Sequence, residues 1–324
     1  IKPVARFRDF YYFVTFFPHL VAGPIIRAEQ FLYQMPRTRR PRLRVFNAGV
    51  FLIIRGLFLK MVCADNIALV VNGYWNSGYR PGANSLSLLV LAVLFAVQIF
   101  CDFEGYSSIA RGLAYLMGFR FPVNFNCPYL ATSFRNFWER WHITLSQWLR
   151  DYLYIPLGGN RVSKWRTYVN LMTVMLLGGL WHGAAMTFVA WGALHGLALA
   201  IERLLGFHKL EKTPGALGKK IAWYVVVQVV VLVTWVFFRS DSMDNALMFL
   251  RNIAACRSGA SGLPFLTAAM FVLPVVAMHV HQFLVERGTI RPIGLVGKAV
   301  LAAVMLYATL VFYGQSSSFI YFQF

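Results

Sequence analysis

Long apolar runs separated by short polar segments dominate this chain. A helix needs about 20 apolar residues to cross a hydrocarbon core of about 30 Å. Six runs approach that length: Phe46–Val71, Leu86–Cys101, Ala184–Leu205, Ile221–Phe238, Leu263–Leu284 and Ala299–Gly314. The pattern predicts an all-α, polytopic membrane protein that forms a single domain over residues 1–324.

The composition agrees with a bilayer environment. The 324 residues are 58% hydrophobic and only 13% charged, which is too apolar for the surface of a soluble domain. The net charge of +19 could indicate nucleic-acid binding, but the basic residues lie in short clusters between apolar runs. We therefore expect a lipid bilayer as partner and no nucleic acid.

The basic clusters predict the topology, because Lys and Arg are enriched in cytoplasmic loops. The clusters are Arg37/Arg39/Arg40/Arg42/Arg44, Arg161/Lys164/Arg166 and Lys209/Lys212/Lys219/Lys220. The segments Asn72–Ser85 and Arg239–Gly262 carry little net charge and are expected on the opposite side.

Two irregular elements are expected besides the spans. The stretch Phe10–Ile26 is broken by Pro18 and Gly23-Pro24, which favours a kinked or re-entrant element packed inside the protein. The stretch Tyr129–Pro156 mixes tryptophans with charges and indicates an amphipathic, interfacial helix. One face of that helix would carry Trp138, His142, Leu145, Leu149 and Tyr152.

A hairpin is predicted around His182. The run Tyr168–Trp181 would span only about 21 Å at 1.5 Å per residue, too short to cross, and basic loops flank the pair formed with Ala184–Leu205. His182 would then lie at the turn, within the membrane, where Gly178, Gly179 and Gly183 allow close backbone approach.

His182 is the leading catalytic candidate. Ionisable residues at membrane depth are costly and often functional, and a neutral imidazole can act as a general base towards a hydroxyl. The competing interpretation is a core histidine bonded to a carbonyl. His142 strengthens the catalytic interpretation because its helix face is expected to pack on the hairpin, whereas alone it could be an interfacial residue.

Other polar residues receive structural or open interpretations. His195 would lie nearly 20 Å along the helix from the turn, so we expect it to support the structure. Asp102 and Glu104 follow an apolar span, where helix capping is the expected role. The histidine and cysteine spacing predicts no metal site.

A basic, glycine-containing loop could hold a phosphate-bearing donor. It combines Gly158-Gly159-Asn160 with four cations: Arg150, Arg161, Lys164 and Arg166. Membrane topology alone would also place basic residues there, so both explanations stay open.

The motifs resemble those of the membrane-bound O-acyltransferase family, in its bacterial alginate O-acetyltransferase branch. They are Arg135-Asn136-Phe137-Trp138-Glu139-Arg140-Trp141-His142, the run from Trp148 to Arg161, Gly179-Leu180-Trp181-His182-Gly183, Trp191-Gly192-x-x-His195-Gly196, Phe17-Pro18-x-x-Val21-Ala22-Gly23-Pro24-Ile25, Asp102-Phe103-x-Gly105-Tyr106-Ser107 and Phe319-Ile320-Tyr321-Phe322-Gln323-Phe324. The resemblance covers essentially the whole chain.

This resemblance implies a helical bundle around a central tunnel, lined by the family's invariant histidine at His182 and its second histidine at His142. It implies transfer of an acetyl group from cytoplasmic acetyl-CoA, with no resident cofactor, towards an extracellular polysaccharide such as alginate or cellulose. It also implies a periplasmic SGNH-type acetyltransferase as partner and a place in the bacterial inner membrane. The several N-terminal helices usual in the family are not in this sequence, which we expect to be the C-terminal part of a longer protein.

Two other functions compete with acetyl transfer. One is a transporter or flippase for a lipid-linked glycan, with proton-relay histidines, although no internal repeat typical of that class is visible. The other is D-alanyl transfer within the same family, which uses a carrier protein as donor. The Pro156–Arg161 loop favours the acetyl branch.

Overall fold

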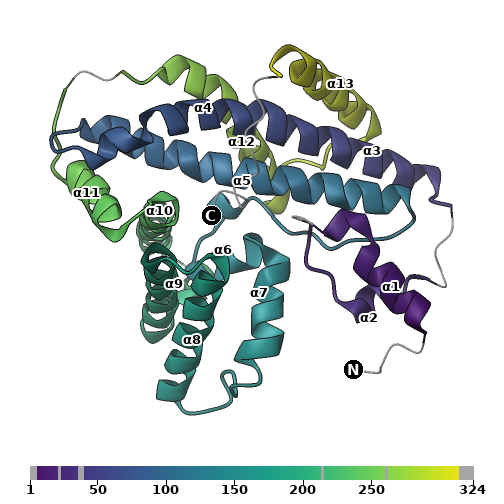
Figure 1. The fold of residues 1–324 in the computed structure, drawn as a ribbon, viewed down its shortest axis with the longest axis horizontal. Helices are drawn as coiled ribbons and strands as arrows, with labels where there is room; N and C mark the ends of the chain where they lie inside the picture. Colours follow the sequence, from purple (N-terminus) through teal and green to yellow (C-terminus); the bar gives the residue numbers. More distant parts are fainter. Residues whose placement is uncertain (1–5, 21–22, 36–39, 213–214, 260–261, 314–324) are drawn as a thin grey trace.

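Helices form the whole regular structure of the described residues in the computed structural model of the protein. These residues are 6–20, 23–35, 40–212, 215–259 and 262–313, and none of them lies in a strand. Figure 1 shows long helices running side by side across the molecule and a second group, α6 to α10, below them. Arg37 and Arg39 of the first basic cluster, Val21 and Ala22, and the 319–324 motif lie outside the described residues.

Two antiparallel rods form the centre. The first is continuous from Leu43 to Tyr79 and the second is α5, Ser85–Leu116. Four segments make up the first rod: α3 (Leu43–Leu57), the π-helical η3 (Phe58–Ala64), α4 (Asp65–Tyr74) and the 3₁₀ turn η4 (Trp75–Tyr79). The 32 residues of α5 extend about 48 Å at 1.5 Å per residue, well beyond the predicted Leu86–Cys101.

Glycines allow the two rods to pack closely. Gly49 and Gly56 of α3 face Gly112 and Gly105 of α5, and the spacing on both helices is seven residues. A Cβ built on Gly56 would lie 2.5 Å from the Gly105 carbonyl oxygen, and one on Gly49 would lie 2.9 Å from the Gly112 oxygen. Small residues let helix backbones approach in lipid, where dispersion contacts stabilise association.

The predicted caps Asp102 and Glu104 are in fact inside α5 and buried. Lys60 pairs with Asp102 at 2.7 Å and with Asp65 at 2.8 Å, while Arg55 pairs with Glu104. The capping prediction was wrong because α5 continues through these residues. The ion pairs with α3 and η3 offset the cost of removing these two carboxylates from water.

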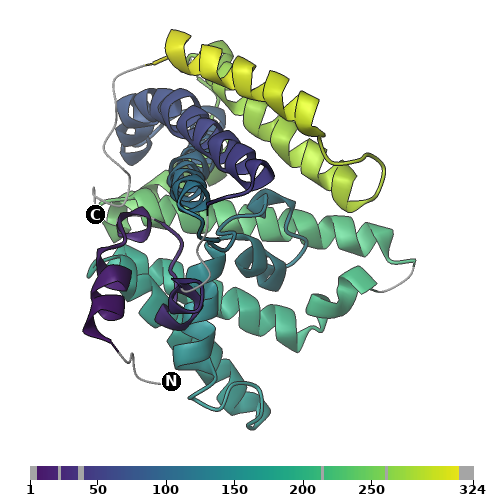
Figure 2. The same ribbon diagram turned by 90° about the vertical axis from the view of Figure 1, so that its right-hand side faces the viewer.

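Four helices among the described residues are long and apolar enough to cross a membrane: Leu43–Tyr79, Ser85–Leu116, α10 (Leu217–Arg239) and α12 (Phe265–Glu286). The two remaining predicted runs are also helices, α9 (Met186–Leu204) and the shorter α13 (Leu295–Val311). In Figure 2, α12 and α13 lie towards one edge of the molecule, and both contact the first rod. The prediction of an all-α, multi-pass membrane protein is confirmed.

The two segments predicted to lie on the same, non-cytoplasmic side are in contact. Asn252, on α11 (Met243–Ala254), donates from Nδ2 to the carbonyls of Gly78 and Arg80, at 2.9 Å each. Arg239 donates to Asn72 Oδ1 at 3.0 Å. The loops therefore share one end of the molecule, as the charge pattern required, and which compartment that end faces stays a prediction.

The N-terminal element is kinked as predicted but only partly internal. It consists of α1 (Phe7–Thr15), the 3₁₀ turn η1 (Phe17–His19) and, further on, α2 (Ala28–Leu32). Phe16 and Pro18 are buried, whereas α1 buries none of its residues. The prediction that the whole stretch packs inside was therefore wrong for α1.

Candidate functional site

His142 lies at a break between two short helices, α6 (Phe134–Arg140) and α7 (Ile143–Leu149). Its backbone is left-handed, with φ 41° and ψ 53°, a conformation that costs roughly 1–2 kcal/mol for a residue with a Cβ. The continuous amphipathic helix predicted over Tyr129–Pro156 was thus wrong, and Tyr152 is exposed instead of sharing a buried face with His142. Residues with a strained backbone of this kind are often found at functional sites.

Backbone hydrogen bonds hold this break. Asn126 N donates to the Arg140 carbonyl and Ile143 N donates to the Asn124 carbonyl, both at 2.9 Å. The segment 124–126, which comes before the 3₁₀ turn η5 (Pro128–Leu130), therefore runs beside the Arg140–Ile143 turn and fixes its path.

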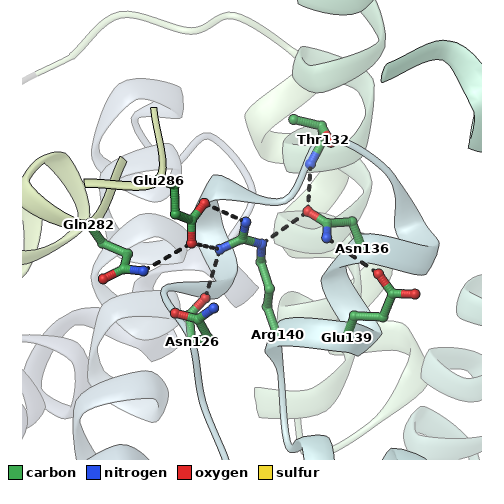
Figure 3. Close-up of polar contacts among 7 residues, drawn as sticks. All are labelled: Asn126, Thr132, Asn136, Glu139, Arg140, Gln282 and Glu286. Carbon is green, nitrogen blue, oxygen red and sulfur yellow. Dashed lines mark hydrogen bonds and ion pairs between the residues drawn. The ribbon is translucent and has the colours of Figure 1, made fainter. Parts of the chain in front are cut away.

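The Arg140 side chain ties the same turn to α12 (Figure 3). It donates two hydrogen bonds to the Glu286 carboxylate, at 3.0 and 2.8 Å, and one to the Asn126 carbonyl at 3.1 Å. Its Nε donates to Asn136 Oδ1 at 3.0 Å. A bidentate guanidinium–carboxylate pair is strong and directional, so α12 restrains the backbone two residues before His142.

Glu202, on α9, holds the other end of α6. Its buried carboxylate accepts from the backbone nitrogens of Phe134 and Arg135, at 2.6 and 3.1 Å, and from Trp223 Nε1 at 3.3 Å. A carboxylate at a helix N-terminus satisfies its free N–H groups and matches the helix dipole. Glu202 was not among the predicted site residues, although it is the single acid in the apolar run 184–205.

His182 is the last residue of α8 (Lys164–His182), which forms the predicted hairpin with α9. Close backbone approach at the glycines is confirmed: a Cβ on Gly179 would collide with the Phe188 carbonyl oxygen, and one on Gly183 with the Phe188 ring. However, α8 begins earlier than Tyr168, and its 19 residues extend about 28 Å. This arm is therefore longer than predicted, because the last residues of the basic loop, from Lys164, belong to the helix.

The two predicted histidines lie close together around Trp181. The Trp181 ring centroid is 5.0 Å from that of His182 and 6.3 Å from that of His142. The two imidazoles are near enough to interact electrostatically. His142 is only 2% exposed, whereas His182 is partly exposed. The structure thus brings both candidates to one place, while their catalytic roles stay a prediction.

Aromatic rings surround His182. Trp191 and Phe238 each lie 5.2 Å from it, both edge-on. Trp191 is also 4.9 Å from His195, so a single indole separates the two histidines. The predicted separation of nearly 20 Å was wrong because the His182 ring lies alongside the first turns of α9. His195 itself is fully buried and bonds through Nε2 to Thr234 Oγ1 at 3.1 Å, as a structural residue would.

The four predicted phosphate-binding cations lie at the far end of α8. All are exposed: Arg150 on the π-helical η6 (Arg150–Tyr154), Arg161 in the following loop, and Lys164 and Arg166 in the first turn of α8. Arg150 pairs with Asp151 at 2.7 Å, which holds the pKa of that carboxyl below its usual value. From Arg166 to His182 the helix rises about 24 Å. Their role in binding acetyl-CoA stays a prediction.

The predicted tunnel also stays a prediction. A cavity of about 300 Å³ lies at the α4–α5 connection and another of about 270 Å³ lies beside α1, and His142 and His182 line neither of these two.

The chain matches the family model of the membrane-bound O-acyltransferases over residues 5–240. This region contains α6 to α10, and therefore both histidines, Trp181 and the basic loop.

Curated relatives point to related activities. A peptidoglycan O-acetyltransferase of Helicobacter pylori is 40% identical over 255 residues, 77% of this chain and 47% of the relative. A probable alginate O-acetylase of Pseudomonas aeruginosa is 43% identical over 238 residues, 74% of this chain and 44% of the relative. A teichoic acid D-alanyltransferase of Bacillus subtilis is 28% identical over 243 residues, 70% of this chain and 58% of the relative. The chain spans about half the length of these relatives.

Proposed function

The chain belongs to the membrane-bound O-acyltransferase family, and on that premise we propose that it transfers an acetyl group from cytoplasmic acetyl-CoA towards a hydroxyl of an extracellular polysaccharide. The observation that carries the proposal is the meeting of His142 and His182 at Trp181, at the ends of α7 and α8. The protein would act in the bacterial inner membrane, with a periplasmic SGNH-type acetyltransferase completing the transfer.

His182 is the general base in this proposal. Its imidazole takes the proton of the acceptor hydroxyl while the oxygen attacks the thioester carbonyl carbon. A C–O bond forms, the C–S bond breaks, and the leaving thiolate takes the proton back from the imidazolium. His142 orients or polarises the donor. The partial exposure of His182 supports its assignment as the base, with His142 acting on the donor, because the acceptor hydroxyl must reach the base.

The basic loop would bind the phosphates of acetyl-CoA. Arg161, Lys164 and Arg166 are exposed in the part of the loop that opens α8, so an anionic group can reach them from water. Because the helix separates them from His182 by about 24 Å, the donor would lie extended along α8, with its thioester end towards the histidines.

The relatives support a glycan acceptor. Two of them are named for O-acetylation of peptidoglycan and of alginate, both of which are hydroxyl-bearing polysaccharides. The D-alanyl relative differs in the acyl group, and its identity to this chain is lower. We therefore propose acetyl as the acyl group and a polysaccharide of the alginate or cellulose type as the acceptor.

The test uses the full-length protein in vesicles with acetyl-CoA radiolabelled in the acetyl group. We expect label transfer to an added glycan or SGNH-type partner, and a fall of at least about 100-fold in His182→Ala, which is within the range for loss of a general base. His281→Gln is the matched control, because that histidine lies on α12 outside the site.

Three outcomes would overturn the proposal. Undiminished acetyl transfer in His182→Ala would show that His182 is not the general base. Movement of a glycan without label transfer would favour a transporter. Transfer of D-alanine from a carrier protein, without any acetyl transfer, would show that acetyl-CoA is not the donor.

A further inference from the structure

Asn124 is fully buried, and each polar atom of its side chain has a partner. Its Oδ1 lies 2.8 Å from Thr144 Oγ1, 3.3 Å from Thr144 N and 3.2 Å from His142 Nδ1. Its Nδ2 donates to Ser107 Oγ, on α5, at 3.1 Å. Asn124 thus joins α5 and α7 beside one of the two site histidines.

The donors around Asn124 determine which way its amide points. A backbone N–H can only donate, so the atom facing Thr144 N must be the oxygen. Thr144 Oγ1 already accepts from Ile25 N at 3.0 Å, and its own proton is therefore available for Asn124 Oδ1. The flipped amide would place an NH₂ group against two donors, which excludes it on hydrogen-bonding grounds.

The same logic determines the tautomer of His142. Because Asn124 Oδ1 is an acceptor, the His142 Nδ1 that faces it must carry a proton. In a neutral ring, Nε2 then holds the lone pair. The side-chain hydrogen-bond partner of the His142 ring is Asn124, and aromatic rings lie around the imidazole, with Phe103 at 4.6 Å and Trp181 at 6.3 Å.

We propose that Asn124 is a positioning residue for acyl transfer, which holds His142 as the Nδ1–H tautomer with Nε2 free to accept a hydrogen bond or a proton. This inference rests on the proposed function. It also narrows the part of His142: a neutral ring without a proton on Nε2 cannot polarise a carbonyl from that atom. Two parts remain for His142. Its Nε2 either accepts a hydrogen bond from an N–H or O–H of the acyl donor, or shares with His182 the task of accepting a proton.

The tautomer can be measured without any activity. In the full-length protein, labelled with ¹⁵N in histidine and reconstituted in bilayers, ¹⁵N chemical shifts separate protonated from unprotonated ring nitrogens, and the His142→Gln spectrum identifies the His142 signals. We expect a protonated Nδ1 and an unprotonated Nε2. A wild-type Nε2–H tautomer would overturn the proposal, whatever the protein is found to catalyse.

Kinetics test the positioning role with matched variants. Asn124→Leu has a similar size but no acceptor, and we expect a mixture of tautomers and a fall in kcat of about 10- to 100-fold, as for other partners that orient a functional histidine. KM for acetyl-CoA should change by less than about threefold, because the interaction lost acts on the reacting groups. Asn124→Asp keeps an acceptor facing Nδ1 and should retain kcat within about tenfold.

Ser107→Ala is the control for a general packing effect. It removes the partner of Asn124 Nδ2 and leaves the Oδ1 contacts to Thr144 and His142 in place. We expect it to keep the Nδ1–H tautomer and most of kcat. Asn124→Leu with an unchanged tautomer and unchanged kcat would overturn the proposal. If Asn124→Leu does not fold, Asn124→Asp takes its place: a fall in its kcat as large as that in His142→Gln would overturn the proposal. If the wild type transfers no acyl group while the tautomer is as stated, the proposed function fails and the orientation of His142 stands.

Discussion

Arg140 and Glu286 form a bidentate ion pair across 146 residues of sequence, with N···O distances of 3.0 and 2.8 Å. The pair connects the end of α12 with the turn that carries His142. Because 40 residues separate the two histidines along the chain, their approach depends on contacts of this kind between α6, α9 and α12.

We expect Arg140 and Glu286 to be energetically coupled. Arg140→Met and Glu286→Gln should each lower the thermal unfolding midpoint in detergent, and Arg140→Met should lower kcat as well, because its turn would loosen. In a double-mutant cycle, the coupling should be about 0.5–1.5 kcal/mol, in the lower part of the range for contacting residues, because the pair is bidentate but its side chains are 15% and 33% exposed. Additive effects of the two substitutions would show that the pair does not act as a unit. Arg135→Met is a suitable control, since its pair with Glu139 is exposed on both sides.

Close packing of α3 on α5 should make Gly56 intolerant of any side chain. Gly56→Ala places a Cβ 2.5 Å from the Gly105 carbonyl oxygen, so the helices must separate. We expect a destabilisation of at least about 1–3 kcal/mol, as for overpacking of a core, measured as a fall in the unfolding midpoint. Gly73→Ala on α4 is the control: apart from its own helix, no atom of the described residues lies within 4 Å of a Cβ built there, and helix propensity favours Ala by up to about 1 kcal/mol. Equal effects in the two variants would contradict the packing argument.

Thr234 should stabilise His195 through one hydrogen bond. Thr234 Oγ1 donates its proton to the Val231 carbonyl at 2.8 Å, so it accepts from His195 Nε2–H. Thr234→Val keeps the shape and leaves a buried N–H without an acceptor, which should cost about 1–3 kcal/mol in stability. Thr309→Val, where the hydroxyl bonds only to the Met305 carbonyl one turn earlier, should cost less. The comparison is read from unfolding midpoints, and a larger loss in Thr309→Val would refute the assignment.

Glu202→Gln should loosen α6 and the His142 turn together. The carboxylate accepts from two backbone nitrogens and one indole, and Gln supplies a single acceptor oxygen. Hydrogen bonds to a charged group contribute about 1.5–3 kcal/mol each. We expect a lower unfolding midpoint and faster hydrogen exchange at the amides of Phe134 and Arg135. Unchanged exchange at these two amides would show that Glu202 does not hold the helix end.

The basic loop should affect acetyl-CoA binding and not the chemical step. Arg161→Glu combined with Arg166→Glu should raise KM for acetyl-CoA several-fold, with kcat changed little, because both side chains lie far from His182. The effect should weaken at high salt, which screens exposed charges over about 10 Å at 0.1 M. Arg291→Glu, an exposed charge beyond α12, is the control. A fall in kcat at constant KM would assign the loop a different role.

The sequence by itself determined the class of the protein and its candidate histidines. Apolar runs of spanning length and clustered Lys and Arg are local features with direct physical meaning. They correctly predicted an all-α membrane protein, and the two segments expected on one side, Asn72–Ser85 and Arg239–Gly262, do lie at one end of the molecule. The motifs around His142 and His182 identified the family, which is confirmed. The basic loops on either side predicted the α8–α9 hairpin, and the glycines beside His182 correctly indicated close backbone approach at its turn.

Only the tertiary structure decided what surrounds those residues. A 3.6-residue period cannot reveal that the chain turns left-handed at His142, since hydrogen bonds from a separate segment at Asn124 and Asn126 stabilise that turn. Nor can it reveal that Asp102 is paired, since its partner Lys60 lies on another helix. Asn124 and Glu286 had no local signal of function, and Glu202 had only its place as the single acid of an apolar run. Their roles come from partners far along the chain, which only the folded protein brings within hydrogen-bonding distance.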